Sequence, residues 1–223
     1  MQTEYYFPTQ IYITDLYLDN ESLAKKITDW RDRDEGIQRS NKLGWHSAID
    51  MHHREEYNEF TMALFDAMKE VMNNECYHPN LEPLIGTMWA NINKKFSYNK
   101  THVHPGSLWS GVYYVKAPEN YGDLLIKYPR SGPLILDPRR DENKQRPRQL
   151  WNEVKYKPTV GRLIIFPGWL PHEVDANQSE DERISISFNT NTNWKKDEYV
   201  KVQRKGHETG GNITESTFKN RYK

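Results

Sequence analysis

Apolar residues recur at helical spacing in two segments of the N-terminal third of the chain. Leu23, Ile27 and Trp30 are separated by steps of four and three, which predicts an amphipathic helix over residues 20–31. A second helix is predicted over residues 55–74, and its apolar stripe comprises Phe60, Leu64, Ala67 or Met68, and Val71. The polar stretch between the two helices, residues 31–54, is expected to be a loop.

The pattern changes after Pro83 to short runs of aromatic and β-branched residues separated by Pro, Gly and Asn. These runs predict strands over residues 84–93, 108–115, 123–128, 133–137, 161–166, 172–174 and 184–192. Many short strands in succession are typical of two sheets that close into a sandwich or a jelly roll. The sequence therefore predicts a mainly β fold with flanking helices.

Two polar segments are expected to lie outside this core. Residues 138–151 are rich in basic side chains, and they predict a mobile loop over one end of the sheets. The loop could serve as a lid with a basic lining, but a plain solvated loop is favoured for most of its charges. From Trp194 onward the chain is charged and poor in aliphatic residues, which indicates a polar tail and not a second domain. The predicted organisation is one domain over residues 1–193, followed by a tail over residues 194–223.

Composition narrows the possible functions. The 223 residues contain 31 Lys and Arg and 31 Asp and Glu, and a net charge of zero argues against a dedicated nucleic-acid binder. A mean hydropathy of −0.95 argues against a membrane span. Cys76 is the only cysteine, which excludes an intramolecular disulfide and a cysteine-based zinc site. The first residues lack the features of a secretion signal, so we expect a cytoplasmic protein, in the host cytoplasm if the chain is viral.

Three of the eight histidines lie where they could bind one metal ion. His102 and His104 precede the predicted strand 108–115, and residues two apart in a strand point to the same side. His172 follows the predicted strand 161–166 at a turn bracketed by Pro167 and Pro171. Three imidazoles on one face suit Fe(II) and leave coordination positions for a substrate and oxygen. Histidines with purely structural roles remain an alternative at this point.

The strand predicted over residues 184–192 has one polar face. Alternation places Arg183, Ser185, Ser187 and Asn189 together, opposite Ile184, Ile186 and Phe188. An arginine at the start of a buried strand is costly unless it pairs with an anion. Its guanidinium group matches a carboxylate with two parallel hydrogen bonds, and a hydroxyl can add a third. The pattern indicates a carboxylate-binding pocket, with a solvent-facing polar surface as the alternative.

Five motifs together resemble a known superfamily, and they span about residues 7–191: YFPTQIY, WANIN, HVHPGSLWSGVYYVKAP, GRLIIFPGWLPHEV and ERISISFN. Their order, with a His-x-His pair, two strands, a histidine and then Arg-x-Ser, resembles that of Fe(II)- and 2-oxoglutarate-dependent dioxygenases. More narrowly, the chain resembles the 2-oxoglutarate/Fe(II) oxygenases of marine bacteria and their cyanophages. The resemblance implies a double-stranded β-helix, a cupin-like jelly roll with N-terminal helices packed on the major sheet.

The resemblance also implies that His102, His104 and His172 hold Fe(II). Most of the superfamily carries Asp or Glu at the middle position, so the imidazole of His104 would leave the charge of the ion to be balanced by 2-oxoglutarate. A second register remains open, in which His104 is the first ligand and Gly106 stands at the acid position.

Other site residues follow from the same resemblance. Arg183, supported by Ser185, would bind the distal carboxylate of 2-oxoglutarate, and the Tyr114 hydroxyl would donate a hydrogen bond to it. Ser110 shares the inward face of that strand with Tyr114 and is a further cofactor-binding candidate. The remaining predicted pocket residues are Asn91, Asn93, Asn189 and Trp89. The implied reaction consumes 2-oxoglutarate and O₂, releases succinate and CO₂, and hydroxylates a substrate C–H bond.

Two other functions fit the same residues. A cupin-type dioxygenase would use the three histidines without 2-oxoglutarate, and a non-catalytic jelly-roll module would use them structurally. The sequence does not identify the primary substrate, for which a protein side chain or a small metabolite is favoured over a nucleic acid. It also does not define the oligomeric state.

Overall fold

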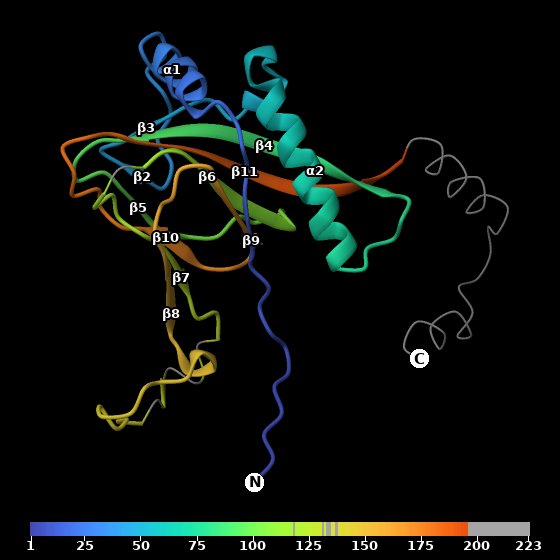
Figure 1. The fold of residues 1–223 in the computed structure, drawn as a ribbon, viewed down its shortest axis with the longest axis vertical. Coiled ribbons are helices and arrows are strands. Elements are labelled where there is room, and N and C mark those ends of the chain that lie inside the picture. The colour runs from blue at the N-terminus through green and yellow to red at the C-terminus, as the bar shows by residue number, and fades with distance from the viewer. Residues whose placement is uncertain (118, 131, 133–134, 137, 196–223) are drawn as a thin grey trace, which may run out of the picture.

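The computed structural model describes residues 1–117, 119–130, 132, 135–136 and 138–195. Figure 1 shows two helices above one β-sheet and a second set of strands below it. The helices are α1 (Asn20–Arg31) and α2 (Asn58–Asn74), and the short 3₁₀ turns are η1 (Met51–His53), η2 (Glu55–Tyr57) and η3 (Arg148–Leu150). The strands are β1 (Tyr12–Asp15), β2 (Asn41–Lys42), β3 (Trp45–His46), β4 (Leu81–Asn93), β5 (Tyr98–His102), β6 (Trp109–Lys116), β7 (Leu124–Lys127), β8 (Glu153–Tyr156), β9 (Arg162–Pro167), β10 (His172–Val174) and β11 (Arg183–Trp194).

The strands form two antiparallel sheets. The larger sheet has the order β1-β9-β6-β11-β4-β3, and the smaller has the order β2-β5-β10-β7-β8. Most neighbouring strands are distant in the sequence, because the chain passes repeatedly from one sheet to the other. This arrangement is that of a jelly roll, and it confirms the predicted fold class.

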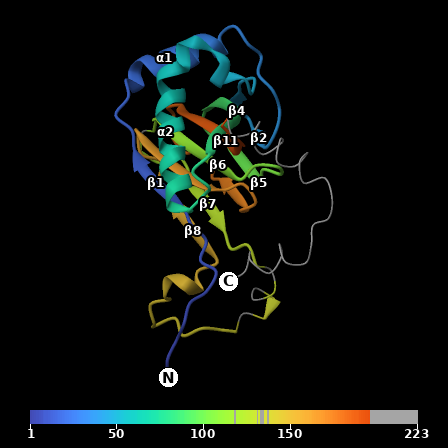
Figure 2. The same cartoon turned by 90° about the vertical axis from the view of Figure 1, so that its right-hand side faces the viewer.

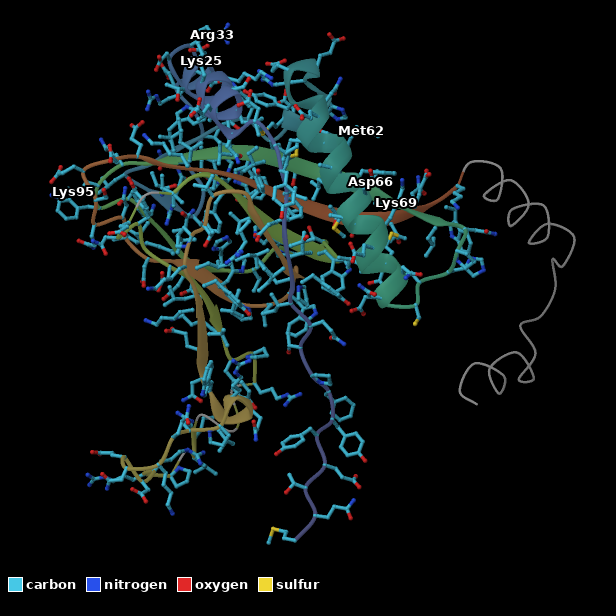
Figure 3. All side chains as sticks on the ribbon, in the orientation of Figure 1. Lys25, Arg33, Met62, Asp66, Lys69 and Lys95 are labelled. Carbon is cyan, nitrogen blue, oxygen red and sulfur yellow. The ribbon has the colours of Figure 1, made fainter. Side chains whose placement is uncertain are left out.

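The helices cover the outer face of the larger sheet, as their apolar stripes predict. Leu23, Ile27 and Trp30 of α1 are buried in one core cluster with Phe60 and Leu64 of α2. Burial of each such side chain contributes about 1.5–3 kcal/mol to folding. The charged faces point away from the sheet, as Figure 3 shows for Lys25 of α1 and for Asp66 and Lys69 of α2. The N-terminus of α1 is capped by Asp19, whose carboxylate accepts a hydrogen bond from the Ser22 N–H at 3.0 Å.

Several predicted elements differ from the observed ones. The helix predicted over residues 55–74 is divided, because residues 55–57 form η2 before α2 begins at Asn58. The predicted loop 31–54 contains the two-residue strands β2 and β3, and η1. The strands β1, β5 and β8 are short and largely polar, so no run of apolar residues marked them. The strand predicted over residues 133–137 falls partly outside the described residues, and the described Ile135 and Leu136 are not in a strand.

The basic segment 138–151 does not lie over the end of the sheets. It follows the end of β7 and precedes β8, and Figures 1 and 2 show it projecting away from the body of the molecule. The N-terminal residues contact it, since the Gln149 Nε2 atom donates to the Tyr5 hydroxyl at 3.0 Å. None of residues 138–151 lines the cavity between the sheets. The segment fits the solvated loop, and it does not form a lid over the cavity in this structure.

The C-terminal boundary also differs slightly from the prediction. Strand β11 runs through Trp194, and the Lys195 N–H donates to the Asn80 carbonyl oxygen at 3.0 Å. The predicted tail thus begins inside the last strand, and its residues 196–223 lie outside the described residues. Within the described residues, no helix is both long enough and apolar enough to cross a membrane.

Candidate metal centre and dicarboxylate pocket

The inner faces of the two sheets enclose a cavity of about 600 Å³. Ten of the eleven predicted site residues line it, namely Trp89, Asn91, Asn93, His102, His104, Tyr114, His172, Arg183, Ser185 and Asn189. Ser110 lies behind these residues, and its buried hydroxyl donates to the Oδ1 atom of the lining residue Asn189 at 2.7 Å. The alternation that placed Arg183, Ser185 and Asn189 on one face is confirmed. A volume of this size suits a small-molecule site.

The three predicted histidines meet at one point of this cavity. His102 is the last residue of β5 and pairs directly with His172, the first residue of β10. His104 lies just beyond β5, where its N–H donates to the Gly168 carbonyl oxygen at 2.8 Å. One ring nitrogen from each histidine lies within 4.8 Å of the other two, and the Nε2 atoms of His104 and His172 are 3.2 Å apart.

Two backbone carbonyls orient the imidazole rings. The Nδ1 atom of His102 lies 2.7 Å from the Lys100 carbonyl oxygen, and that of His172 lies 2.9 Å from the Leu170 carbonyl oxygen. Because a carbonyl only accepts hydrogen bonds, each Nδ1 carries the proton and each Nε2 keeps a free lone pair. Hydrogen bonds of this kind commonly fix the tautomer of metal-binding histidines.

Burial keeps these imidazoles neutral. It is the main cause that lowers the pKa of His172 to about 3 and of His104 to about 4, and the charge of His102 lowers both further. Burial lowers the pKa of His102 as well. Neutral imidazole is the form that binds metal ions.

The donor set fits a divalent cation. Two cis nitrogen ligands about 2.1 Å from one ion lie roughly 3 Å apart, close to the observed 3.2 Å between the His104 and His172 Nε2 atoms. The described residues that line the cavity include no Asp or Glu. The nearest carboxylate in the sequence, Glu173, turns instead to Lys127 at 2.7 Å. The His102 and His172 Nε2 lone pairs are therefore available to a cation at this point of the cavity.

Arg183 supplies a buried positive charge to the same cavity. Its side chain is 2% exposed, and its Nη1 group donates to the Tyr121 and Gly122 carbonyl oxygens at 2.7 and 2.9 Å. No carboxylate among the described residues forms an ion pair with it, and its remaining N–H groups have no partner there. Burial lowers the pKa of the guanidinium, against the opposing effects of Tyr114 and Asp175. A buried cation in this state calls for an anionic ligand.

The walls beside Arg183 offer further polar groups. Cross-strand pairing places Arg183 next to Asn93, and Ser185 between Asn91 and Tyr114. Burial raises the pKa of Tyr114 to about 12, so its hydroxyl stays protonated and can donate. Within the described part of the chain, the buried Asn91 Oδ1 and Asn93 Nδ2 atoms have no hydrogen-bond partner. Unpaired buried polar atoms of this kind indicate a place for a polar ligand.

Sequence reasoning missed several residues of the cavity. Three of them, Arg39, Ser40 and His46, come from the segment predicted as a loop. Two others, Thr87 and Asn99, lie within β4 and β5. The His46 ring stacks on Trp89 with 5.3 Å between the ring centres and 7° between the planes. The positions of Arg39 and His46 follow from the pairing of β2 with β5 and of β3 with β4, which no periodic pattern in the sequence indicated.

Comparison with known proteins agrees with this geometry. Residues 87–189 match the family described as "Putative 2OG-Fe(II) oxygenase", where 2OG is 2-oxoglutarate. No curated protein matches the chain. Similar solved structures include a Pseudomonas putida prolyl-4-hydroxylase, with a TM-score of 0.53, 15% identity and coverage of 81% of this chain and 92% of that one.

Two further structures share the fold. A Trichoplax adhaerens prolyl hydroxylase has a TM-score of 0.55 and 16% identity over 81% of this chain and 82% of its own. The non-heme alpha ketoglutarate-dependent epimerase SnoN of nogalamycin biosynthesis has a TM-score of 0.58 and 12% identity over 84% of this chain and 80% of its own. At these identities the similarity establishes the fold. The match to the 2OG-Fe(II) oxygenase family, whose cofactors are Fe(II) and 2-oxoglutarate, covers residues 87–189 and includes His102, His172 and Arg183.

Proposed function

We propose that this protein is an Fe(II)- and 2-oxoglutarate-dependent dioxygenase that hydroxylates a C–H bond of its substrate and releases succinate and CO₂. The observation that carries the proposal is the convergence on a single cavity of three imidazoles and one buried guanidinium group that has no carboxylate partner among the described residues. The imidazoles suit Fe(II), and the guanidinium suits a carboxylate. A chelating dicarboxylate such as 2-oxoglutarate requires both.

The histidines would hold the iron through their Nε2 atoms. The backbone carbonyls of Lys100 and Leu170 keep the rings of His102 and His172 in the tautomer that leaves Nε2 free. This arrangement supports His102 and His104 as ligands together with His172, in preference to a register that begins at His104. The bound iron and 2-oxoglutarate would supply the oxidising chemistry.

The larger sheet would hold the distal carboxylate of 2-oxoglutarate. The Tyr121 and Gly122 carbonyls fix the Nη1 side of Arg183, which leaves its other N–H groups to donate to the carboxylate. The hydroxyls of Tyr114 and Ser185 lie on neighbouring strands and would donate further hydrogen bonds. Because these groups are held by paired strands, they are oriented before the ligand arrives, which favours catalysis by positioning.

Release of succinate tests the proposal. Purified protein supplied with Fe(II), ascorbate, O₂ and 2-oxoglutarate should release succinate and CO₂ in equal amounts, even slowly without the primary substrate. The His172→Ala variant should release none, whereas His53→Ala, which changes an exposed histidine outside the cavity, should match the original protein. Iron binding without any use of 2-oxoglutarate would instead favour the cupin-type reaction. Failure to bind iron would favour the non-catalytic module.

A further inference from the structure

The cavity carries more positive charge than the proposed cofactors balance. Arg39 and Arg183 are the only charged side chains among the described lining residues, apart from histidines whose pKa values are lowered. The two positive charges of a divalent iron ion are equal in size to the two negative charges of doubly ionised 2-oxoglutarate, so the cofactors together add no net charge. The cavity with both cofactors bound therefore keeps a net positive charge from its two arginines, because these lining residues include no Asp or Glu. Since the distal carboxylate of 2-oxoglutarate is assigned to Arg183, Arg39 is left without an anionic partner.

The two arginines occupy different parts of the cavity. Arg183 is 2% exposed and lies at the closed end, whereas Arg39 is exposed and therefore lies at the open end. The closed end suits the distal carboxylate of 2-oxoglutarate, as proposed above. The open end is where a primary substrate would enter and remain.

The guanidinium group of Arg39 is unpaired although its backbone is fixed. The backbone N–H of Arg39 donates to the Asn41 Oδ1 atom at 2.6 Å. The strand β2, which pairs with β5, begins two residues after Arg39. Among the described residues, no hydrogen bond or ion pair engages the Arg39 side chain. The positive charge of Arg39 nevertheless acts on the cavity wall, because burial and this charge both lower the pKa of His46.

The wall between Arg39 and the metal centre is flat and aromatic. His46 stacks on Trp89, and the Trp89 ring centre lies 5.9 Å from that of His104. The Asn99 Nδ2 atom donates to the Ser40 hydroxyl at 3.2 Å, which ties the segment after Arg39 to β5. A compact ligand on this wall would place one end at Arg39 and the other beside the histidines.

We propose that the primary substrate is a compact carboxylic acid, whose carboxylate binds the Arg39 guanidinium while its body rests on the His46–Trp89 wall. The inference rests on the proposed function and adds the chemical class of its substrate. Planar guanidinium groups bind carboxylates with two parallel hydrogen bonds, and nothing among the lining residues competes for Arg39. The single cation at the open end suits one acidic group.

Binding of matched ligand pairs tests the proposal. The protein is loaded with Ni(II) and N-oxalylglycine, a 2-oxoglutarate mimic that does not react. Calorimetry then measures the affinity for a set of small carboxylic acids and for the corresponding neutral amides. At least one acid should bind about tenfold more tightly than its amide, as expected for a charge-assisted hydrogen bond of about 1.5 kcal/mol. A parallel set of phosphate monoesters tests whether another oxyanion binds instead.

Variants locate the preference and separate the two proposals. The preference for acids should disappear in Arg39→Gln and persist in Arg39→Lys. The control is Lys42→Gln, which removes a positive charge from β2, close to Arg39 in the sequence but outside the cavity, and it should leave the preference unchanged. N-oxalylglycine should bind all of these variants within about twofold of the original protein, since Arg39 does not contact its site. No preference for any acid, a preference only for phosphate esters, or a preference unaffected by Arg39→Gln would overturn the substrate class. If the original, Ni(II)-loaded protein does not bind N-oxalylglycine at all, the proposed function itself would be overturned.

Discussion

The substitution Arg183→Lys tests the role of the buried guanidinium most sharply. Lysine keeps the positive charge but loses the planar fork that can bind a carboxylate and two carbonyls at once. Arg183 already uses Nη1 for the Tyr121 and Gly122 carbonyls, at 2.7 and 2.9 Å, so a single ammonium group cannot replace all of its bonds. Loss of one charge-assisted hydrogen bond to the ligand costs about 1.5–3 kcal/mol, or roughly 10- to 150-fold in Kd for 2-oxoglutarate.

Calorimetric titration of the Ni(II)-loaded variant with 2-oxoglutarate measures this loss. A thermal melt of the variant shows whether it is still folded. A backbone carbonyl left without a hydrogen bond lowers the free energy of unfolding by about 1–3 kcal/mol, which corresponds to several degrees in Tm. The control is Arg162→Lys, which alters a half-buried arginine paired with Asp15 at 2.9 Å on the same sheet, outside the cavity. Affinity for 2-oxoglutarate that is unchanged in a folded Arg183→Lys protein would refute the assignment of this residue.

Three further changes test other parts of the site. His172→Ala should lower Ni(II) affinity at least roughly 100-fold by calorimetry, because it removes a ligand, and unchanged affinity would exclude the three-histidine centre. Gly122→Ala should weaken 2-oxoglutarate binding in the same assay, since Gly122 has a φ of +79° and a Cβ there would lie 2.2 Å from the Asp175 carbonyl oxygen. The metal-free protein should lose stability in urea as the pH falls from 6.5 towards 4, because His104 and His172, with pKa values near 4 and 3, gain protons only on unfolding in that range. Stability in urea that does not change between pH 6.5 and 4 would contradict the burial of His104 and His172 as neutral rings.

The sequence predicted the parts of the fold that depend on strong local patterns. The helix over residues 20–31 and the strand over residues 172–174 coincide with α1 and β10. The polar face beginning at Arg183 was also predictable, because alternation along a strand fixes which side chains share a side. Strands such as β5 and β2 were not predicted, because they are short and consist mostly of polar residues. Their extended conformation depends on hydrogen bonds to the neighbouring strands, which the local sequence does not reveal.

The candidate site shows the same division. His102, His104 and His172 could be singled out by residue type and position, but only the pairing of β5 with β10 brings them together. Arg39 and His46 could not be found in this way, since both lie in a polar stretch without periodicity. The Ser110 hydroxyl donates to Asn189, which lines the cavity, and this contact depends on the pairing of β6 with β11.

A crystal structure of the protein with Ni(II) and 2-oxoglutarate tests the central claim most directly. The account predicts the Nε2 atoms of His102, His104 and His172 on one ion, with the distal carboxylate of 2-oxoglutarate on the guanidinium of Arg183. An ion bound by only two of these histidines, or a dicarboxylate that leaves Arg183 unpaired, would contradict it.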